Sequence, residues 1–490
     1  MSDCCSIKPT SAAASPIDSR AKAEGKHLII VGGGGAAFSA ALKSSSLGAR
    51  ATIINDGLPM GGTCVNVGCV PSKTLLRAAE SLHRAQHQSA FAGITTTGKL
   101  ADFAAVMRQK RELVEELRQA KYADVIADDA NIRFVRGRGR LVDARTVEVN
   151  GERLRGDAIL LCTGARPAVP DVPGLANVPF LTNESAFELT ELPESLLVLG
   201  GRYIALECAQ IFARLGSRVT VLQRSARILP TESPELTDEL TGHLKAESLA
   251  IVTGVAIQRV FKDGAGVAVE ATVDGKPKTF RAAQLLVATG RTPNSAGLGL
   301  ENVGVKVDAH GFVSVDAHLA TAVPGIYAAG DVVGEPMFVY TAAYEGALAV
   351  ENALTGAGRQ RDYTALPWVV FTDPQVAGVG LDLTQAKADG RDAEAVTLPL
   401  SQVPRAIAAR DTRGFIQLVR DRATDRIVGA RILAPEGSEL LMEIALAIKF
   451  GITARELAGS FHAYLTLSEG VKLAALSFGK NVAKLSCCAA

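Results

Sequence analysis

The first strong pattern in the chain is an apolar run that stops at a row of glycines. Residues 27–31, HLIIV, are typical of a buried strand, and residues 32–37, GGGGAA, lead into a helix-like apolar run from Phe38 to Leu42. A second strand-like run follows at 51–54. Strand, glycine turn, helix and strand in this order predict a Rossmann-type unit, in which backbone N–H groups at the helix N-terminus bind a pyrophosphate.

The same pattern occurs a second time. Residues 195–199, SLLVL, lead into GGRYIA at 200–205, then a helix and a strand at 218–222. Each unit is also followed by a strand that ends in a Thr-Gly turn, ILLCTGARP at 159–167 and LLVATGRTP at 285–293. One glycine turn can arise by chance, but two with matching downstream signals predict two dinucleotide sites. A third strand ends in Gly330-Asp331, where a carboxylate is placed to accept a cofactor hydroxyl.

The two units differ where the second strand ends. There an acidic residue binds a ribose 2′-hydroxyl, whereas arginines accommodate a 2′-phosphate. The second unit has Gln223, Arg224 and Arg227 at this place. We interpret the two arginines as a site for the 2′-phosphate of NADPH; the alternative is that they only lie on a solvated turn. The first unit has Asn55 and Asp56, and the sequence does not decide between them. Arg202 replaces the middle glycine, where it either crowds the pyrophosphate or adds charge to it.

The segment from Gly61 to Lys73, GGTCVNVGCVPSK, carries the strongest chemical signal. Cys64 and Cys69 are separated by four residues at the start of a predicted helix, so they can close a small disulfide ring. A helix N-terminus lowers the pKa of a thiol, and Lys73 adds positive charge nearby. These features predict a redox-active pair rather than two unrelated buried thiols.

Composition then excludes several classes of protein. The 52 Lys and Arg residues balance 51 Asp and Glu residues, so the net charge of +1 favours no nucleic acid or anionic membrane as partner. The chain lacks an apolar run long enough to span a membrane and an apolar signal core, so we expect no stable membrane association and a cytoplasmic location. Eight cysteines are too few for a disulfide scaffold; Cys162 and Cys208 lie in apolar contexts and are predicted to be structural.

From residue 26 onwards the chain resembles the flavin-dependent pyridine nucleotide–disulfide oxidoreductases. This resemblance implies an α/β fold with two Rossmann-like domains, for FAD and NADPH, and a C-terminal α+β dimerisation domain. It also implies that Cys69 faces the flavin, that Lys73 and Glu207 pair beside it, and that Tyr203 covers the nicotinamide pocket. The cofactor-binding residues predicted from the motifs are Gly32, Gly34, Gly35, Ala36, Ala37, Asn55, Asp56, Gly62, Thr63, Lys73, Thr163, Gly164, Gly200, Gly201, Gln223, Arg224, Arg227, Gly290 and Asp331.

The resemblance also sets domain boundaries. They are a tail at 1–25, the FAD-binding domain at 26–165 and 290–365, the NADPH-binding domain at 166–289, and the dimerisation domain at 366–490.

Two departures from the family pattern indicate the branch that reduces Hg(II). Tyr464 stands where disulfide reductases carry a histidine as general acid, and the chain ends in a vicinal thiol pair, Cys487-Cys488, that suits a soft metal ion. The resemblance implies a homodimer in which Cys487 and Cys488 of the partner subunit pass thiol-bound Hg(II) to Cys64 and Cys69, with Tyr203 and Tyr464 lining the transfer site. The alternatives are an NADPH-dependent disulfide reductase and a metal-binding flavoprotein without turnover.

Overall fold

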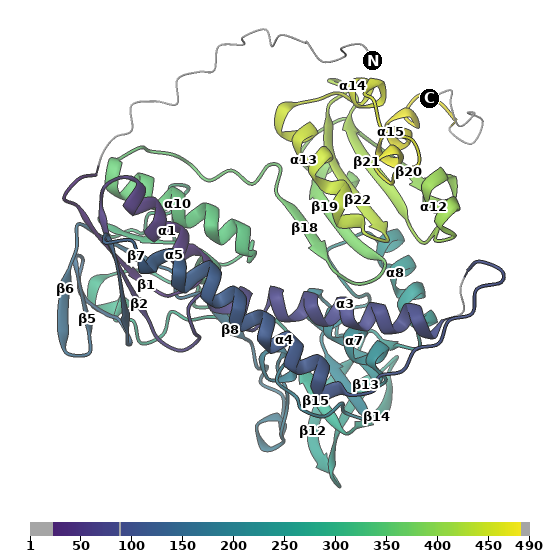
Figure 1. Cartoon of the computed structure of the whole chain (residues 1–490), viewed down its shortest axis with the longest axis horizontal. Helices are drawn as coiled ribbons and strands as arrows, with labels where there is room; N and C mark the ends of the chain where they lie inside the picture. The colour runs from purple at the N-terminus through teal and green to yellow at the C-terminus, as the bar shows by residue number, and fades with distance from the viewer. Residues whose placement is uncertain (1–22, 88–89, 482–490) are drawn as a thin grey trace, which may run out of the picture. The chain divides into compact units, whose positions relative to one another are not determined.

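The computed structural model describes residues 23–87 and 90–481, which fall into two compact units (Figure 1). The first unit takes its described residues from 23–57, 125–164 and 295–360. The second takes them from 58–87, 90–124, 165–294 and 361–481. Cys4, Cys5, Cys487, Cys488 and most of the predicted N-terminal tail lie outside the described residues.

A five-stranded parallel sheet in the order β17-β7-β1-β2-β3 forms the centre of the first unit. Its strands are β1 (His27–Val31), β2 (Arg50–Asn55), β3 (Ile132–Arg136), β7 (Ala158–Leu161) and β17 (Ile326–Ala328). Helices α1 (Gly35–Ser46) and α10 (Val339–Thr355) lie side by side (Figure 1). A Cβ on Gly346 would come within 2.2 Å of the Ala36 carbonyl oxygen, so only glycine permits this approach. A small antiparallel sheet completes the unit, with β4 (Arg140–Asp143), β5 (Thr146–Val149) and β6 (Glu152–Arg155).

The second unit contains its own parallel sheet, in the order β11-β10-β9-β15. The strands are β9 (Ser195–Leu199), β10 (Arg218–Leu222), β11 (Ala250–Val252) and β15 (Gln284–Val287). Helix α7 (Tyr203–Leu215) connects β9 to β10, and α8 (Pro234–Ala246) precedes β11. The remaining strands here are antiparallel: β12 (Ala256–Asp263), β13 (Gly266–Val273), β14 (Lys276–Ala282), and the pair β8 (Ala165–Pro167) and β16 (Arg291–Pro293).

The C-terminal part of the second unit is an antiparallel sheet with helices, in the order β18-β19-β22-β21-β20. Its strands are β18 (Pro367–Val370), β19 (Gln375–Gly380), β20 (Ala393–Pro399), β21 (Phe415–Asp421) and β22 (Ile427–Ala434). Its helices include α13 (Leu441–Phe450), α14 (Ala454–Gly459) and α15 (Glu469–Leu476). Two parallel sheets with glycine turns and this α+β part confirm the predicted fold class, while the exact domain boundaries stay predictions.

Three helices of the second unit surround the cysteine motif. They are α2 (Gly62–Asn66), α3 (Cys69–Gln86) and α4 (Phe103–Arg118), and α4 continues into a π-helical turn, η1 (Gln119–Ala123). Helix α3 packs along α7 through a core that includes Leu75, Leu76 and Phe212. The start of α3 is thereby fixed against the helix that follows the second glycine turn. Within residues 23–87 and 90–481, no helix combines the length and apolarity that a membrane span requires.

Candidate active site

The glycine turn of the first unit has the geometry of a phosphate-binding loop. Gly32 has φ +124°, and a Cβ there would lie 2.1 Å from the Cys162 carbonyl oxygen. A Cβ on Gly33 would collide with the Asn55 side chain at 2.5 Å. Because the strands are parallel, their carboxyl ends meet at one edge of the sheet. That edge carries the predicted residues Gly32, Gly34, Gly35, Ala36, Ala37, Asn55, Asp56, Thr163, Gly164 and Asp331.

Three polar residues at this edge have distinct surroundings. Asn55 is the last residue of β2, whereas Asp56 is exposed and accepts a hydrogen bond from the Gly57 N–H at 2.9 Å. Asp331 follows Gly330, which has φ +77° and donates its N–H to Glu345 Oε2 at 2.6 Å. The buried Glu345 carboxylate thus fixes the turn that presents Asp331. The choice between Asn55 and Asp56 stays open.

The glycine turn of the second unit repeats this geometry. Gly200 has φ +119°, and a Cβ there would lie 2.3 Å from the Ala288 carbonyl oxygen. A Cβ on Gly201 would lie 3.0 Å from the Gln223 side chain, which is buried at the end of β10. Arg224 and Arg227 are exposed beyond it, and Arg227 Nε lies 3.1 Å from Asp238 Oδ1. Both arginines follow β10 in the chain, and their contact with NADPH stays a prediction.

The helices that follow the two glycine turns have uncapped N-termini. Neither α1, with Gly34 at its N-cap, nor α7, with the exposed Arg202, has a side-chain cap or an acidic residue in its first turn. In contrast, α4 is capped by Asp102 and α8 by Ser233. The first N–H groups of a helix need an acceptor from outside the helix, and a phosphate supplies one. Both turns are thus suited to the pyrophosphate of a dinucleotide.

The redox pair lies on two consecutive helices of the second unit. Cys64 is on the short α2, and Cys69 is the first residue of the 18-residue α3. Gly61 and Gly62, with φ +88° and +60°, make the turn into α2. Both cysteines are half-buried free thiols in this structure. The positive end of the dipole of α3 also stabilises the thiolate form of Cys69.

The two thiols have opposite ionisation behaviour. A hydrogen bond from the Cys64 side chain, with help from the charge on Lys73, lowers the pKa of Cys69 to about 7 despite its burial. The same hydrogen bond, together with burial, raises the pKa of Cys64 well above its usual range. Cys69 is therefore the thiolate of the pair, and Cys64 keeps the proton. By contrast, burial raises the pKa of both Cys162 and Cys208, which fits their predicted structural role.

Lys73 is held by a buried carboxylate and an aromatic ring. Its Nζ lies 2.8 Å from Glu207 Oε2, and Glu207, on α7, is only 6% exposed. Glu207 Oε1 accepts the Phe371 N–H at 3.1 Å, and the Phe371 ring centre lies 4.4 Å from Lys73 Nζ. Three distant segments thus fix one ammonium group close to Cys69. The cation–π contact with Phe371 was not predicted, because nothing in the local sequence marks that residue.

Asn66, between the two cysteines, fixes the shape of the loop. It is 7% exposed, and its Nδ2 donates to the carbonyl oxygens of Met60 at 3.0 Å and Gly62 at 2.8 Å. Its Oδ1 accepts from Arg118 Nη1 at 3.2 Å. The amide therefore ties the glycine turn before Cys64 to the end of α4. Sequence reasoning missed Arg118, which lies 52 positions away.

Tyr122 is a second residue that sequence reasoning missed. It lies on the π-helical turn η1, and such turns are frequent at functional sites. Its ring packs at Gly61, where an added Cβ would lie 2.9 Å from Tyr122 Cε2. Burial, and the negative charge that Cys64 and Cys69 can carry, raise the pKa of its phenol. Tyr122 thus belongs to the surroundings of the thiol pair, although its charged sequence context gave no signal.

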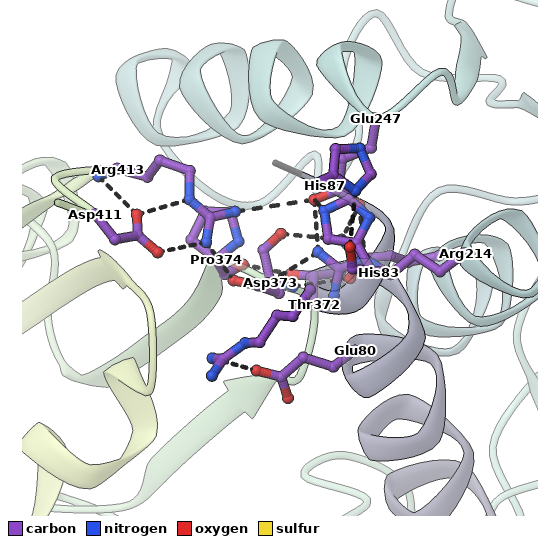
Figure 2. A network of polar contacts seen from close by, with 12 residues as sticks. Glu80, His83, His87, Arg214, Glu247, Thr372, Asp373, Pro374, Asp411 and Arg413 are labelled. Atoms are coloured by element: carbon purple, nitrogen blue, oxygen red, sulfur yellow. Dashed lines mark hydrogen bonds and ion pairs between the residues drawn. The ribbon is translucent and has the colours of Figure 1, made fainter. Parts of the chain in front are cut away.

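The far end of α3 is anchored in a buried ionic network (Figure 2). Arg214 donates to Glu247 Oε1 at 2.6 Å and to Asp373 Oδ2 at 2.8 Å, and its side chain is 3% exposed. Arg413 Nη2 lies 2.9 Å from Asp373 Oδ1. His83, in the last turn of α3, lies 3.7 Å from Glu247 Oε1. The network joins α3 and α7 to the loop between β18 and β19, and so holds the helix whose first residue is Cys69.

The remaining predicted site residues are not all brought together. Tyr464 is 53% exposed, and the neighbouring His462 is bound to Glu443. Tyr203 begins α7 and stacks on Trp368. Cys487 and Cys488 lie outside the described residues. Within the described part of the chain, no group of three or more His, Cys, Asp and Glu side chains could hold a metal ion.

Known proteins match this chain over nearly its whole length. The family described as pyridine nucleotide-disulphide oxidoreductase matches residues 26–346, and its dimerisation domain matches residues 366–475. The mercuric reductase of Staphylococcus aureus is 44% identical over 462 residues, which are 94% of this chain and 84% of that protein. The mercuric reductase of Streptomyces lividans is 44% identical over 95% of this chain and 98% of that protein.

A solved structure matches as well. The HOCl-induced flavoprotein disulfide reductase RclA from Escherichia coli has a TM-score of 0.82 and 30% identity, over 93% of this chain and 100% of that chain. Two glycine turns on parallel sheets, a thiol pair at the start of α3 and these matches lead to one conclusion. The chain belongs to the pyridine nucleotide–disulphide oxidoreductase family.

Proposed function

We propose that the protein reduces Hg(II) to Hg(0) with NADPH as electron donor. The observation that carries this proposal is the Cys64/Cys69 pair, two free thiols at the junction of α2 and α3, near the Lys73–Glu207 ion pair. Thiolates are ligands that soft metal ions prefer. The mercuric reductases that share over 40% of its sequence support Hg(II) as the substrate. The reaction balances as NADPH plus Hg(II) giving NADP⁺, a proton and Hg(0).

The residues present fit FAD and NADPH. The uncapped α1 and the strand-end residues Asn55, Asp56 and Asp331 would hold FAD, and the uncapped α7 with Arg224 and Arg227 would hold NADPH. FAD, when bound, supplies the transfer of an electron pair from NADPH to the Cys64–Cys69 disulfide. Lys73 and Glu207 keep a paired charge beside Cys69, and Tyr203 covers the nicotinamide site. Gly62 and Thr63, at the start of α2, and Gly290 complete the cofactor contacts that we propose.

Hg(II) would reach the pair by exchange between thiolates. Cys69 attacks as the thiolate, and Cys64 follows once its proton is lost, so that each incoming sulfur replaces an outgoing one. We assign the earlier step to Cys487 and Cys488 of the partner subunit and place Tyr464 beside that transfer. The charge that Cys64 and Cys69 can carry raises the pKa of Tyr122, and we include this residue in the proposed transfer site.

A homodimer is supported by the C-terminal part of the chain. Its dimerisation domain matches the family, and α13 exposes Met442, Leu446 and Phe450, whose exposed fractions are 55%, 47% and 71%. Exposed apolar side chains that share one helix are typical of a protein–protein interface. A dimer is also what the transfer from the tail of one subunit to the thiols of the other requires.

A disulfide reductase is the second candidate, because RclA is described as one. Against it, Tyr464 replaces the expected histidine, and His462 is bound to Glu443. NADPH oxidation by the purified flavoprotein in excess small thiol separates the candidates. We expect turnover only when Hg(II) is added. Turnover with an organic disulfide alone would favour the second candidate, and no turnover at all would favour a protein that only binds metal.

A further inference from the structure

Tyr203 is held by a residue from another part of the second unit. Its ring stacks on Trp368, with ring centroids 6.0 Å apart and an angle of 18° between the planes. Tyr203 is the first residue of α7, whereas Trp368 lies on β18. Both side chains are half-buried against the same hydrophobic core. The contact therefore joins the nucleotide-binding sheet to the C-terminal sheet through two aromatic rings.

Trp368 itself has little freedom to move. It pairs across the sheet with Gly378 on β19, where an added Cβ would lie 2.4 Å from Trp368 Cζ2. Only a glycine leaves room for the indole in this position. The Arg431 guanidinium lies over the same ring, 5.4 Å from its centroid.

Arg431 is immobilised in turn. Its side chain is 3% exposed, and its Nε donates to Glu232 Oε2 at 2.6 Å. Its Nη1 donates to the Ala430 carbonyl oxygen at 2.9 Å and its Nη2 to Gln385 Oε1 at 3.1 Å. The row of Tyr203, Trp368 and Arg431 thus ends in a buried ion pair rather than in solvent.

We propose that Trp368 is a positioning residue for Tyr203 and thereby for binding of the nicotinamide half of NADPH. This inference rests on the proposed function, in which Tyr203 covers the nicotinamide. An aromatic pair contributes beyond its buried area, so loss of the stack should change nucleotide binding about two- to tenfold. The indole can position Tyr203 because Gly378 and Arg431 hold the indole itself in place.

Trp368 is the single tryptophan of the chain, so tryptophan emission reports on the surroundings of this residue, and comparison with Tyr203 variants isolates the stack. NADP⁺ should be titrated into the holoenzyme while tryptophan emission is recorded, with binding measured independently by calorimetry. We expect NADP⁺ to change the emission in the wild type and in Tyr203→Phe. In Tyr203→Leu, NADP⁺ should still bind while most of the emission change is lost.

Kinetics provide the second arm. Trp368→Leu should lower kcat/KM for NADPH about two- to tenfold, and Trp368→Phe should restore most of it. Gly378→Ala leaves both rings intact but displaces Trp368, so it should lower kcat/KM for NADPH as Trp368→Leu does. It replaces Trp368→Leu in the test if that variant does not fold. Phe415→Leu, in the same core, controls for loosened packing. The thiol titre of the reduced enzyme should be unchanged in all four variants.

These measurements distinguish failure of the proposed function from failure of the positioning role of Trp368. If NADP⁺ does not bind the wild type, the proposed function itself is wrong. If NADP⁺ binds without changing Trp368 emission, or changes it equally in Tyr203→Leu, the positioning role is wrong while the proposed function stands. Equal kcat/KM for NADPH in wild type, Trp368→Leu and Gly378→Ala would also overturn it.

Discussion

The Lys73 ammonium group lies 2.8 Å from the Glu207 carboxylate, and both act on the charge of Cys69. Lys73 lowers the pKa of Cys69, whereas Glu207 raises it. The two members of the pair therefore have opposite effects on the pKa of Cys69. Phe371, through its N–H and its ring, holds both partners at once.

The two members of this pair should have opposite effects on Cys69. Lys73→Met should raise the pKa of Cys69 above its value of about 7, because the thiolate loses a positive neighbour. Glu207→Gln should lower it, and Lys73→Arg, which keeps the charge, should change it least. The pH dependence of alkylation of the reduced enzyme measures this pKa. Shifts of the same sign in Lys73→Met and Glu207→Gln would contradict the assignment.

Cys64 should affect Cys69 more than Lys73 does. The hydrogen bond from Cys64 is the largest cause of the lowered pKa, so Cys64→Ala should raise the pKa of Cys69 and slow its alkylation at neutral pH. Cys64→Ser keeps a donor and should retain part of the effect. In the wild type, alkylation should fall as pH is lowered through about 7, because the thiolate is then protonated. Identical profiles for Cys64→Ala and Cys64→Ser would show that the hydrogen bond is not the cause.

The ionic network around Arg214 should contribute to stability in a pH-dependent way. Burial would raise the pKa of Asp373, but Arg413 and Arg214 together lower it. Its contribution is therefore complete above the unfolded-state pKa and is lost as pH falls through the lower folded-state value. Asp373→Ala should lower the free energy of unfolding by about 1–3 kcal/mol at neutral pH, because Arg214, whose side chain is 3% exposed, loses one of its two carboxylate partners and keeps only Glu247.

Urea unfolding measures this difference. The matched control is Glu194→Gln, which removes an exposed ion pair with Arg218 and should cost about 1 kcal/mol or less. Equal effects of Asp373→Ala and Glu194→Gln would show that the buried network adds no more than a surface pair.

The C-terminal thiols should matter for the substrate and not for the reaction with NADPH. A Cys487→Ala, Cys488→Ala variant should keep anaerobic reduction of the flavin by NADPH and lose efficient turnover with thiol-bound Hg(II). Stopped-flow and steady-state measurements on the same preparation separate the two steps. Unchanged steady-state turnover would remove the tail from the proposed transfer path.

Local patterns predicted much of the fold and part of the site. The glycine turns at Gly32 and Gly200 and the Cys64/Cys69 pair are recognisable because the chemistry needs those residues at fixed spacing within one segment. Tyr122, Phe371 and Trp368 could not be found this way. Each reaches its contact through tertiary packing of distant elements, and each lies in a local sequence that any half-buried helix or strand could have. The ion pair of Arg214 and Asp373 could not be predicted for the same reason, because the two residues are 159 positions apart.

The most direct test of the central claim is the amount of mercury vapour released per NADPH oxidised. The purified flavoprotein should be incubated with NADPH, excess small thiol and Hg(II), and Hg(0) trapped from the gas phase should be compared with the loss of NADPH. The proposed reaction predicts one Hg(0) for each NADPH, and none from a Cys64→Ala, Cys69→Ala variant. NADPH oxidation without release of Hg(0), or release that survives loss of both cysteines, would contradict it.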